Sequence, residues 1–98
     1  MNSNICEAIK LKRKIQFYYE GGTRTVEPYC YGINAKGNEV LRAYQTSGYS
    51  QSGNPGGWRL FITAKINSLI LLNDGFDGNR SEYNPYEKQM TRIYCNVK

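Results

Sequence analysis

The sequence predicts a mainly β domain, folded as a small barrel with one short N-terminal helix. Runs of alternating aliphatic and aromatic residues, such as KIQFYY at 14–19, have the period of two that is typical of strands. Tight turns separate these runs, and short strands joined in this way favour a barrel that covers its own edges. A chain of 98 residues has room for one domain. We therefore assign residues 1–98 to a single domain, with the helix at 4–13 and the barrel at about 14–98.

The N-terminal helix follows from a cap and an apolar face. Asn4 and Glu7 have the spacing of a capping box, in which each side chain satisfies an unpaired backbone amide. The apolar residues that follow share one helical face: Ile5, Ala8 and Ile9.

The rest of the chain alternates strand and turn signals. Gly21 and Gly22 supply the turn of a first hairpin, and Pro28 is expected at an edge or a bulge because it lacks an amide hydrogen. A free edge at Pro28 would let two copies pair as a homodimer. The later elements are predicted as strands at 39–45 and from Trp58, an extended segment at 66–72, a brief helical turn at 84–87 and a closing strand at 90–97.

The composition is basic and aromatic. Lys and Arg number thirteen against eight Asp and Glu, which gives a net charge of +5 and a pI near 9.2, and nine residues are tyrosine. This combination is typical of nucleic-acid-binding domains. A charge of this size also keeps a small domain soluble, so composition alone leaves both explanations open.

The sequence does not predict an enzyme, a cofactor or a metal site. It has no histidine, no Gly-rich phosphate loop and no nucleophile elbow, and Asp74 and Asp77 are interpreted as turn residues. Cys6, Cys30 and Cys95 are odd in number and widely spaced, so we interpret them as buried thiols. No run reaches the roughly 18 apolar residues of a membrane span, and residues 1–13 lack a signal-peptide pattern, which predicts a cytoplasmic protein.

Several short motifs together resemble the WYL domain, a module of bacterial transcription regulators and of proteins linked to phage defence. They are Arg24-x-Val-Glu-Pro-Tyr, Leu41-Arg-Ala-Tyr44, Arg59-Leu-Phe61, Lys65-Ile66 and Phe76. The similarity extends from Ile5 to about Tyr83. Only the leucine of the Trp-Tyr-Leu triplet is present, because the triplet falls at Glu39-Val40-Leu41.

The resemblance implies a barrel of the Sm-like or SH3-like kind that binds a negatively charged ligand, either single-stranded nucleic acid (RNA or DNA) or a nucleotide. It also implies that the basic positions Arg24, Arg59 and Lys65 contact this ligand, with Tyr44 at the end of a matched strand. About a dozen residues precede the first predicted strand, too few for a helix-turn-helix. The output of such a module is therefore expected to pass through a homo-oligomer or a partner chain.

The strand pattern itself places further residues at a ligand surface. Arg42 and Arg59 each have apolar neighbours on both sides, so alternation predicts that both point away from the core, onto one surface. An arginine fork beside an aromatic ring suits a phosphate with a stacked base. The complete predicted ligand set is Arg24, Arg42, Tyr44, Tyr49, Arg59, Phe61 and Lys65. Leu60 is predicted to face the core instead.

The polar loop at 46–57 is expected to close over the ligand and to give it hydrogen bonds. Its candidate residues beside Tyr49 are Ser47, Ser50, Gln51, Ser52 and Asn54.

Two alternatives remain open at this stage. The predicted function is a regulatory or accessory module that binds single-stranded nucleic acid or a nucleotide. The alternative is a protein–protein interaction adaptor that uses a sheet edge and the tyrosine-rich surface. For the arginines themselves, the alternative to ligand binding is that Arg42 and Arg59 form surface salt bridges to Glu39 or Glu27 and that Tyr44 belongs to the barrel wall.

Overall fold

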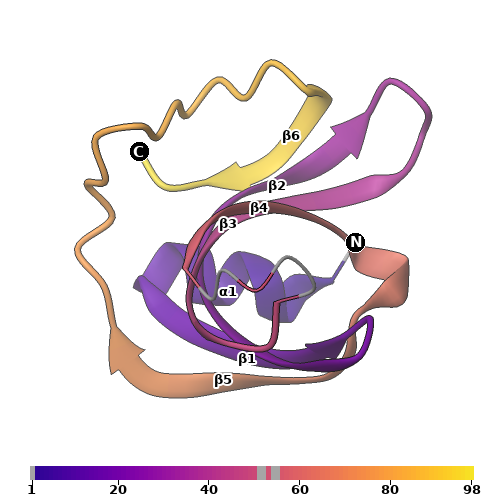
Figure 1. Ribbon diagram of the computed structural model, residues 1–98. Helices are drawn as coiled ribbons and strands as arrows, with labels where there is room; N and C mark the ends of the chain where they lie inside the picture. The colour runs from indigo at the N-terminus through magenta and orange to yellow at the C-terminus, as the bar shows by residue number, and fades with distance from the viewer. Residues whose placement is uncertain (1, 51–52, 54–55) are drawn as a thin grey trace.

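The computed structural model describes residues 2–50, 53 and 56–98 and confirms a mainly β fold with one short N-terminal helix. Figure 1 shows the helix and the strands wound around a common centre. The elements are α1 (Ser3–Leu11), β1 (Arg13–Tyr19), β2 (Gly22–Asn34), β3 (Glu39–Gly48), β4 (Gly57–Ile62), the 3₁₀ turn η1 (Thr63–Lys65), β5 (Asn67–Gly75) and β6 (Met90–Asn96). Within these described residues, no helix is long and apolar enough to cross a membrane.

The strands form one antiparallel sheet that curves strongly but stays open. Its order is β4-β3-β2-β1-β5, with β6 paired to β2, so the first four strands form a meander. Closure of the barrel would require β4 to pair with β5, and the two are the unpaired ends of this order among the described strands. The sheet therefore has the curvature of a barrel without its closing seam (Figure 1).

β2 is the central strand of the sheet. Residues 22–26 pair with β1, residues 30–34 pair with β6 on the same side, and β3 runs along the other side. Pro28 lies between these two pairings, at a register shift against β3, which confirms the predicted bulge. The predicted homodimer edge at Pro28 is wrong, because β2 is flanked on both sides and Pro28 is fully buried.

Helix α1 contributes its apolar face to the core. Asn2 is the N-cap, and its side chain accepts a hydrogen bond from the amide of Asn4 at 2.9 Å, two residues before the predicted cap. The predicted face is buried, since Ile5, Ala8 and Ile9 are at most 2% exposed. These side chains pack with inward residues of the sheet: Ile15, Phe17, Val26, Leu41 and Phe61.

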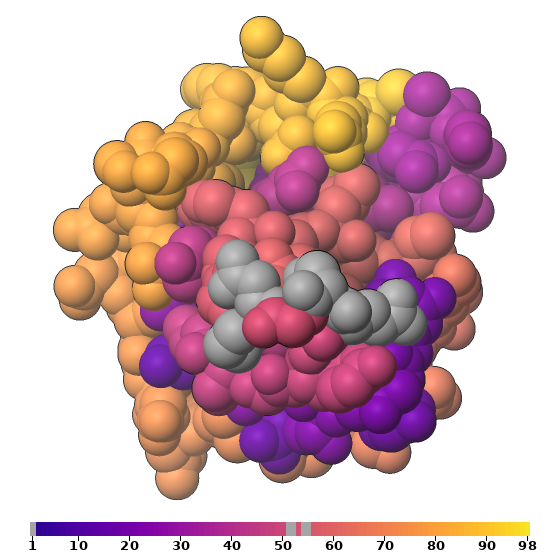
Figure 2. Space-filling model, in the orientation of Figure 1, coloured from indigo at the N-terminus to yellow at the C-terminus, as the bar shows by residue number. Residues whose placement is uncertain are grey.

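Residues 76–89 pack against the outer face of β3 and β4, where Arg42 donates a hydrogen bond to Glu87 and Trp58 donates one to Glu82. Figure 2 shows this segment in orange at the upper left of the molecule. Tyr83 anchors this segment, because its hydroxyl oxygen lies 2.7 Å from the carbonyl oxygen of Val97 and its ring stacks on Trp58. The described residues 85–86 form a bend, so the predicted helical turn at 84–87 is wrong. β4 is therefore covered on both faces, by the core and by this segment.

Two of the three cysteines form a disulfide, which corrects the prediction of three thiols. Cys6 of α1 bonds to Cys95 of β6, across a Cα–Cα distance of 5.8 Å. Cys30 alone is a free thiol, and it is buried against Met90. β6 returns beside α1 after 89 residues, a proximity that local sequence patterns do not reveal.

Cys30 is expected to resist alkylation in the folded protein. Burial, with a smaller contribution from Glu87, raises the pKa of its thiol to about 11. Because the thiolate is the nucleophile, almost none of the reactive form exists at pH 8. Iodoacetamide should modify Cys30 only after urea unfolding, as measured by the mass of the protein. Rapid labelling of the native protein would contradict the burial of this side chain.

Candidate functional site

Five of the seven predicted ligand residues lie on strands, and the structure divides these five between the two faces of the sheet. In the pairing of β3 with β4, Ala43 lies opposite Arg59 and Arg42 lies opposite Leu60. Arg59 thus shares the inner face with buried Ala43, and Arg42 lies on the outer face. The prediction that Arg42 and Arg59 share one surface is wrong.

The predicted positions of Phe61 and Leu60 are also reversed. Phe61 is 1% exposed, and its ring meets those of Phe17 and Tyr19 edge-on at centroid distances of 5.0 and 4.9 Å. Leu60 is partly buried on the outer face, against a small cluster that contains Val40 and Met90. Phe61 is therefore a core residue and does not lie at the surface.

Truncation of these two neighbours should affect stability in the order that their burial implies. Phe61→Ala removes a ring from the centre of the core and is expected to lower the free energy of unfolding by about 3–5 kcal/mol. Leu60→Ala should lower it by less than about 2 kcal/mol, because its side chain is only partly buried. Urea denaturation of both variants measures the difference. A larger loss of unfolding free energy for Leu60→Ala would show that Leu60, and not Phe61, faces the core.

On the outer face, at β3, Arg42 and the neighbouring Arg80 are already paired. The Nε atom of Arg42 lies 2.9 Å from a carboxylate oxygen of Glu87. Arg80 lies over the ring of Tyr44 at 3.5 Å from its centroid and forms an ion pair of 2.7 Å with Glu27. Arg42 thus forms a salt bridge, as in the alternative, but with Glu87 and not with the predicted Glu39 or Glu27. Tyr44 is a half-buried wall residue beneath Arg80, so this face offers few uncompensated charges to an anion.

Lys65 is held at the edge of the molecule. It forms an exposed ion pair of 2.9 Å with Glu20, which also raises the pKa of the Lys65 ammonium group. Exposed pairs of this kind contribute little to stability, so an anionic ligand is able to compete with Glu20 for Lys65.

Arg24 occupies a different environment, which we call the Arg24 site. Its side chain lies on the inner face of β2 and is only 5% exposed. Three aromatic rings surround the guanidinium group, at centroid distances of 5.2 Å for Tyr19, 5.5 Å for Tyr49 and 5.8 Å for Phe61. Such cation–π contacts favour a desolvated cation but give its N–H groups no acceptor.

The hydrogen bonding of the Arg24 site is incomplete. Arg24 donates one long bond, of 3.5 Å, from Nη2 to the carbonyl oxygen of Glu20, and its buried Nε has no partner in the described part of the chain. Gln45 is fully buried on β3, where its Nε2 donates to the carbonyl oxygen of Tyr49 at 2.8 Å. The Oε1 atom of Gln45 also has no partner there. The Nε–H donor of Arg24 and the Oε1 acceptor of Gln45 are thus left available at one end of the sheet.

Two neighbouring residues complete this end of the molecule. Arg59, on the inner face of β4, donates to the carbonyl oxygens of Trp58 and Gly56 and to the hydroxyl of Ser50, at 3.1–3.4 Å. Tyr49 is 44% exposed and lies against Gly22, where an added Cβ would fall 2.3 Å from the Cβ of Tyr49. Only glycine allows Tyr49 to occupy this position beside Arg24.

The predicted loop residues fall partly outside the described structure. Ser50 contacts Arg59, and Ser47 belongs to β3 rather than to a loop. Gln51, Ser52 and Asn54 lie outside the described residues.

The Arg24 site thus unites three predicted residues, Arg24, Tyr49 and Phe61, with two that the sequence analysis missed. The missed residues are Tyr19 and Gln45. Gln45 had a detectable signal, because it continues the alternation of Leu41 and Ala43 and so places an amide on an apolar strand face. Chemically, a buried guanidinium surrounded by aromatic rings, with a second arginine on the same inner face of the sheet, is suited to an anion with a flat group attached.

Comparisons with protein-family models, with curated proteins and with solved structures find no match to this chain.

Proposed function

We propose that this domain binds a phosphate-bearing ligand, either single-stranded nucleic acid or a nucleotide, at the Arg24 site. The proposal depends on the guanidinium group of Arg24. Arg24 is only 5% exposed, and among the described residues no carboxylate forms an ion pair with it. Transfer of an unpaired charge out of water is unfavourable by several kcal/mol. A phosphate that bonds to the unpaired Nε would compensate that charge.

The surroundings of Arg24 favour a nucleotide over a bare anion. The rings of Tyr19 and Tyr49 lie within 5.5 Å of the guanidinium group, and aromatic side chains of this kind stack on bases. Tyr49 covers Arg24 from the solvent side, so the ligand takes the place of that ring or stacks on it. The WYL-like motif order and the net charge of +5 support the same class of ligand. In this proposal the domain is a regulatory or accessory module and not an enzyme.

Salt dependence of binding tests the proposal and counts the contacts. A labelled single-stranded oligonucleotide is titrated by fluorescence anisotropy at several salt concentrations, with mononucleotides and duplex DNA as competitors. Two contacts, from Arg24 and Arg59, predict a slope of log affinity against log salt of about −1.4, since each phosphate contact on a single strand contributes about 0.7. Four contacts, with Arg42 and Lys65 included, predict a slope of about −2.8. Absence of binding to every one of these ligands at low salt would refute the proposed function.

An adaptor function has support from a different surface. On the outer side of β1 and β5, Tyr18 and Ile70 are 46% and 52% exposed, and β5 is an end strand of the sheet. An added strand from a protein partner would find both backbone groups and apolar side chains there. Ile70→Lys would abolish a protein complex of this kind, whereas oligonucleotide binding at the Arg24 site would not change.

A further inference from the structure

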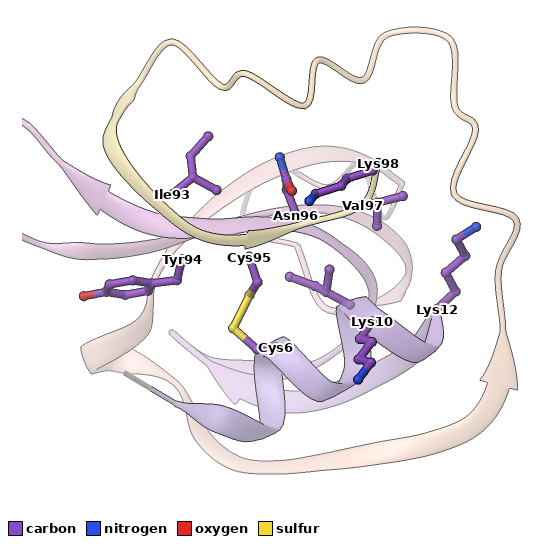
Figure 3. Close-up of a pocket in the computed structure, with 10 residues that line it drawn as sticks. Cys6, Lys10, Lys12, Ile93, Tyr94, Cys95, Asn96, Val97 and Lys98 are labelled. Atoms are coloured by element: carbon purple, nitrogen blue, oxygen red, sulfur yellow. A yellow bond between two sulfur atoms is a disulfide. The ribbon is translucent and has the colours of Figure 1, made fainter.

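A pocket of about 600 Å³ lies between α1 and β6, away from the Arg24 site (Figure 3). Both halves of the disulfide, Cys6 and Cys95, contribute to its lining, and both residues are partly exposed. A structural disulfide is normally enclosed by its surroundings. This one borders an open space into which a small molecule fits.

The pocket is basic. Among the described residues, Lys10, Lys12 and Lys98 contribute to its lining, and no acidic side chain does. Figure 3 shows the disulfide between α1 and β6, with Lys10 on α1, Lys12 at the end of α1 and Lys98 beside the end of β6. The three ammonium groups have no ion pair with a carboxylate in the described part of the chain. Glu7 lies on α1 one turn before Lys10 but does not line the pocket. The pocket therefore attracts anions close to the S–S bond.

We propose that this pocket receives small anionic thiols and that the Cys6–Cys95 disulfide undergoes exchange with them. The thiolate of the small molecule attacks the Sγ atom of Cys95, the Cys6–Cys95 bond breaks, and Cys6 leaves as a thiolate. A second small thiolate then attacks the mixed disulfide at the sulfur of the small molecule. The products are two protein thiols, after uptake of two protons, and one small-molecule disulfide. The protein disulfide is reduced and the small thiols are oxidised.

The position of Cys6 supports its role as the leaving group. Cys6 lies in the N-terminal half of α1, where the helix dipole favours a thiolate, and Lys10 follows it at the i+4 position on the same helical face. The anionic portion of the incoming thiol pairs with the lysines while its sulfur approaches the bond. A cationic thiol of the same size meets repulsion at the same point.

Rates of reduction by thiols of different charge test this inference. Oxidised protein is treated with mercaptoethanesulfonate (anionic), mercaptoethanol (neutral) or cysteamine (cationic), quenched with an alkylating agent, and analysed by mass for labelling of Cys6 and Cys95. The same rates are measured for a Lys10→Gln/Lys12→Gln variant. The ratio of wild-type to variant rate, taken for each thiol, cancels its intrinsic reactivity. We expect the ratio to be about fivefold for the anionic thiol, near one for the neutral thiol and below one for the cationic thiol.

A matched surface variant and a salt series complete the experiment. Lys36→Gln removes an exposed lysine from the β2–β3 turn and should leave all three rates unchanged. The anion preference should shrink in 0.5 M salt, where screening is strong. Equal ratios for the three thiols would overturn the proposal. A rate of reduction that does not depend on thiol concentration would also overturn it, because the disulfide would then be reached only through unfolding. Isolation of the protein with Cys6 and Cys95 reduced under oxidising conditions would overturn it as well.

Discussion

Replacement of Arg24 by methionine is expected to weaken ligand binding and to make the domain more stable. Methionine fills a similar volume among the rings of Tyr19, Tyr49 and Phe61 but carries no charge to desolvate. We expect the free energy of unfolding to rise by about 1 kcal/mol, since replacement of buried charges by apolar side chains is often neutral or stabilising. Oligonucleotide affinity should fall by about tenfold to a hundredfold, the value of a charge-assisted hydrogen bond. Urea denaturation and anisotropy titration measure the two effects on the same samples.

Arg92 offers a matched control for this substitution. Its guanidinium group lies over a single ring, that of Tyr94, at 5.9 Å, and the residue is exposed. Arg92→Met should change stability by no more than about 0.5 kcal/mol and should leave binding intact. If Arg24→Met instead destabilises the protein and retains full affinity, Arg24 is a structural residue and the proposed site is wrong.

Loss of the disulfide is expected to cause a large loss of stability. The bond joins residues 89 positions apart, so it removes a large amount of conformational entropy from the unfolded state. For a loop of this length the entropic contribution is about 4–5 kcal/mol at 25 °C. Cys6→Ala/Cys95→Ala should lower the free energy of unfolding by that amount, as measured by urea denaturation under non-reducing conditions.

A reducing agent provides the control for the alanine substitutions. It should destabilise the wild-type protein to about the level of the double variant and should have no further effect on that variant. A wild-type protein whose stability does not respond to the reducing agent would show that the two thiols are not bonded in solution.

The local parts of the fold were predictable because their signals are local. The helix face of Ile5, Ala8 and Ile9 and the alternation of Ile15, Phe17 and Tyr19 depend only on residues close in sequence. The disulfide was not predictable, because three cysteines do not specify a pairing and residue 95 reaches α1 only through the path of β6. Closure of the sheet also depends on strands that are distant in sequence. Among the described strands, the end strands β4 and β5 do not pair with each other.

The candidate site shows the same division. Arg24 was found from its motif, but the orientation of β4 was not, because apolar residues at Trp58, Leu60 and Phe61 occur on both of its faces. That pattern arises because residues 76–89 pack on the outer face of the strand. The residues of β4 alone do not predict this packing. Strand alternation therefore gives the relative faces of Arg59 and Phe61 but not which of the two faces is the core.

The division of β2 at Pro28 sets an order for folding. Residues 13–48 contain β1, β2 and β3, whose hairpins close over short loops and at small entropic penalty. β6 pairs with residues 30–34 only after a search across more than fifty intervening residues, so it is expected to dock last. Until then the second half of β2 exposes a row of unsatisfied amides and carbonyls beside Tyr31 and Ile33, which is a template for association with another chain. Oxidation of Cys6 with Cys95 shortens that vulnerable interval, because it holds β6 next to the strand that it must cover.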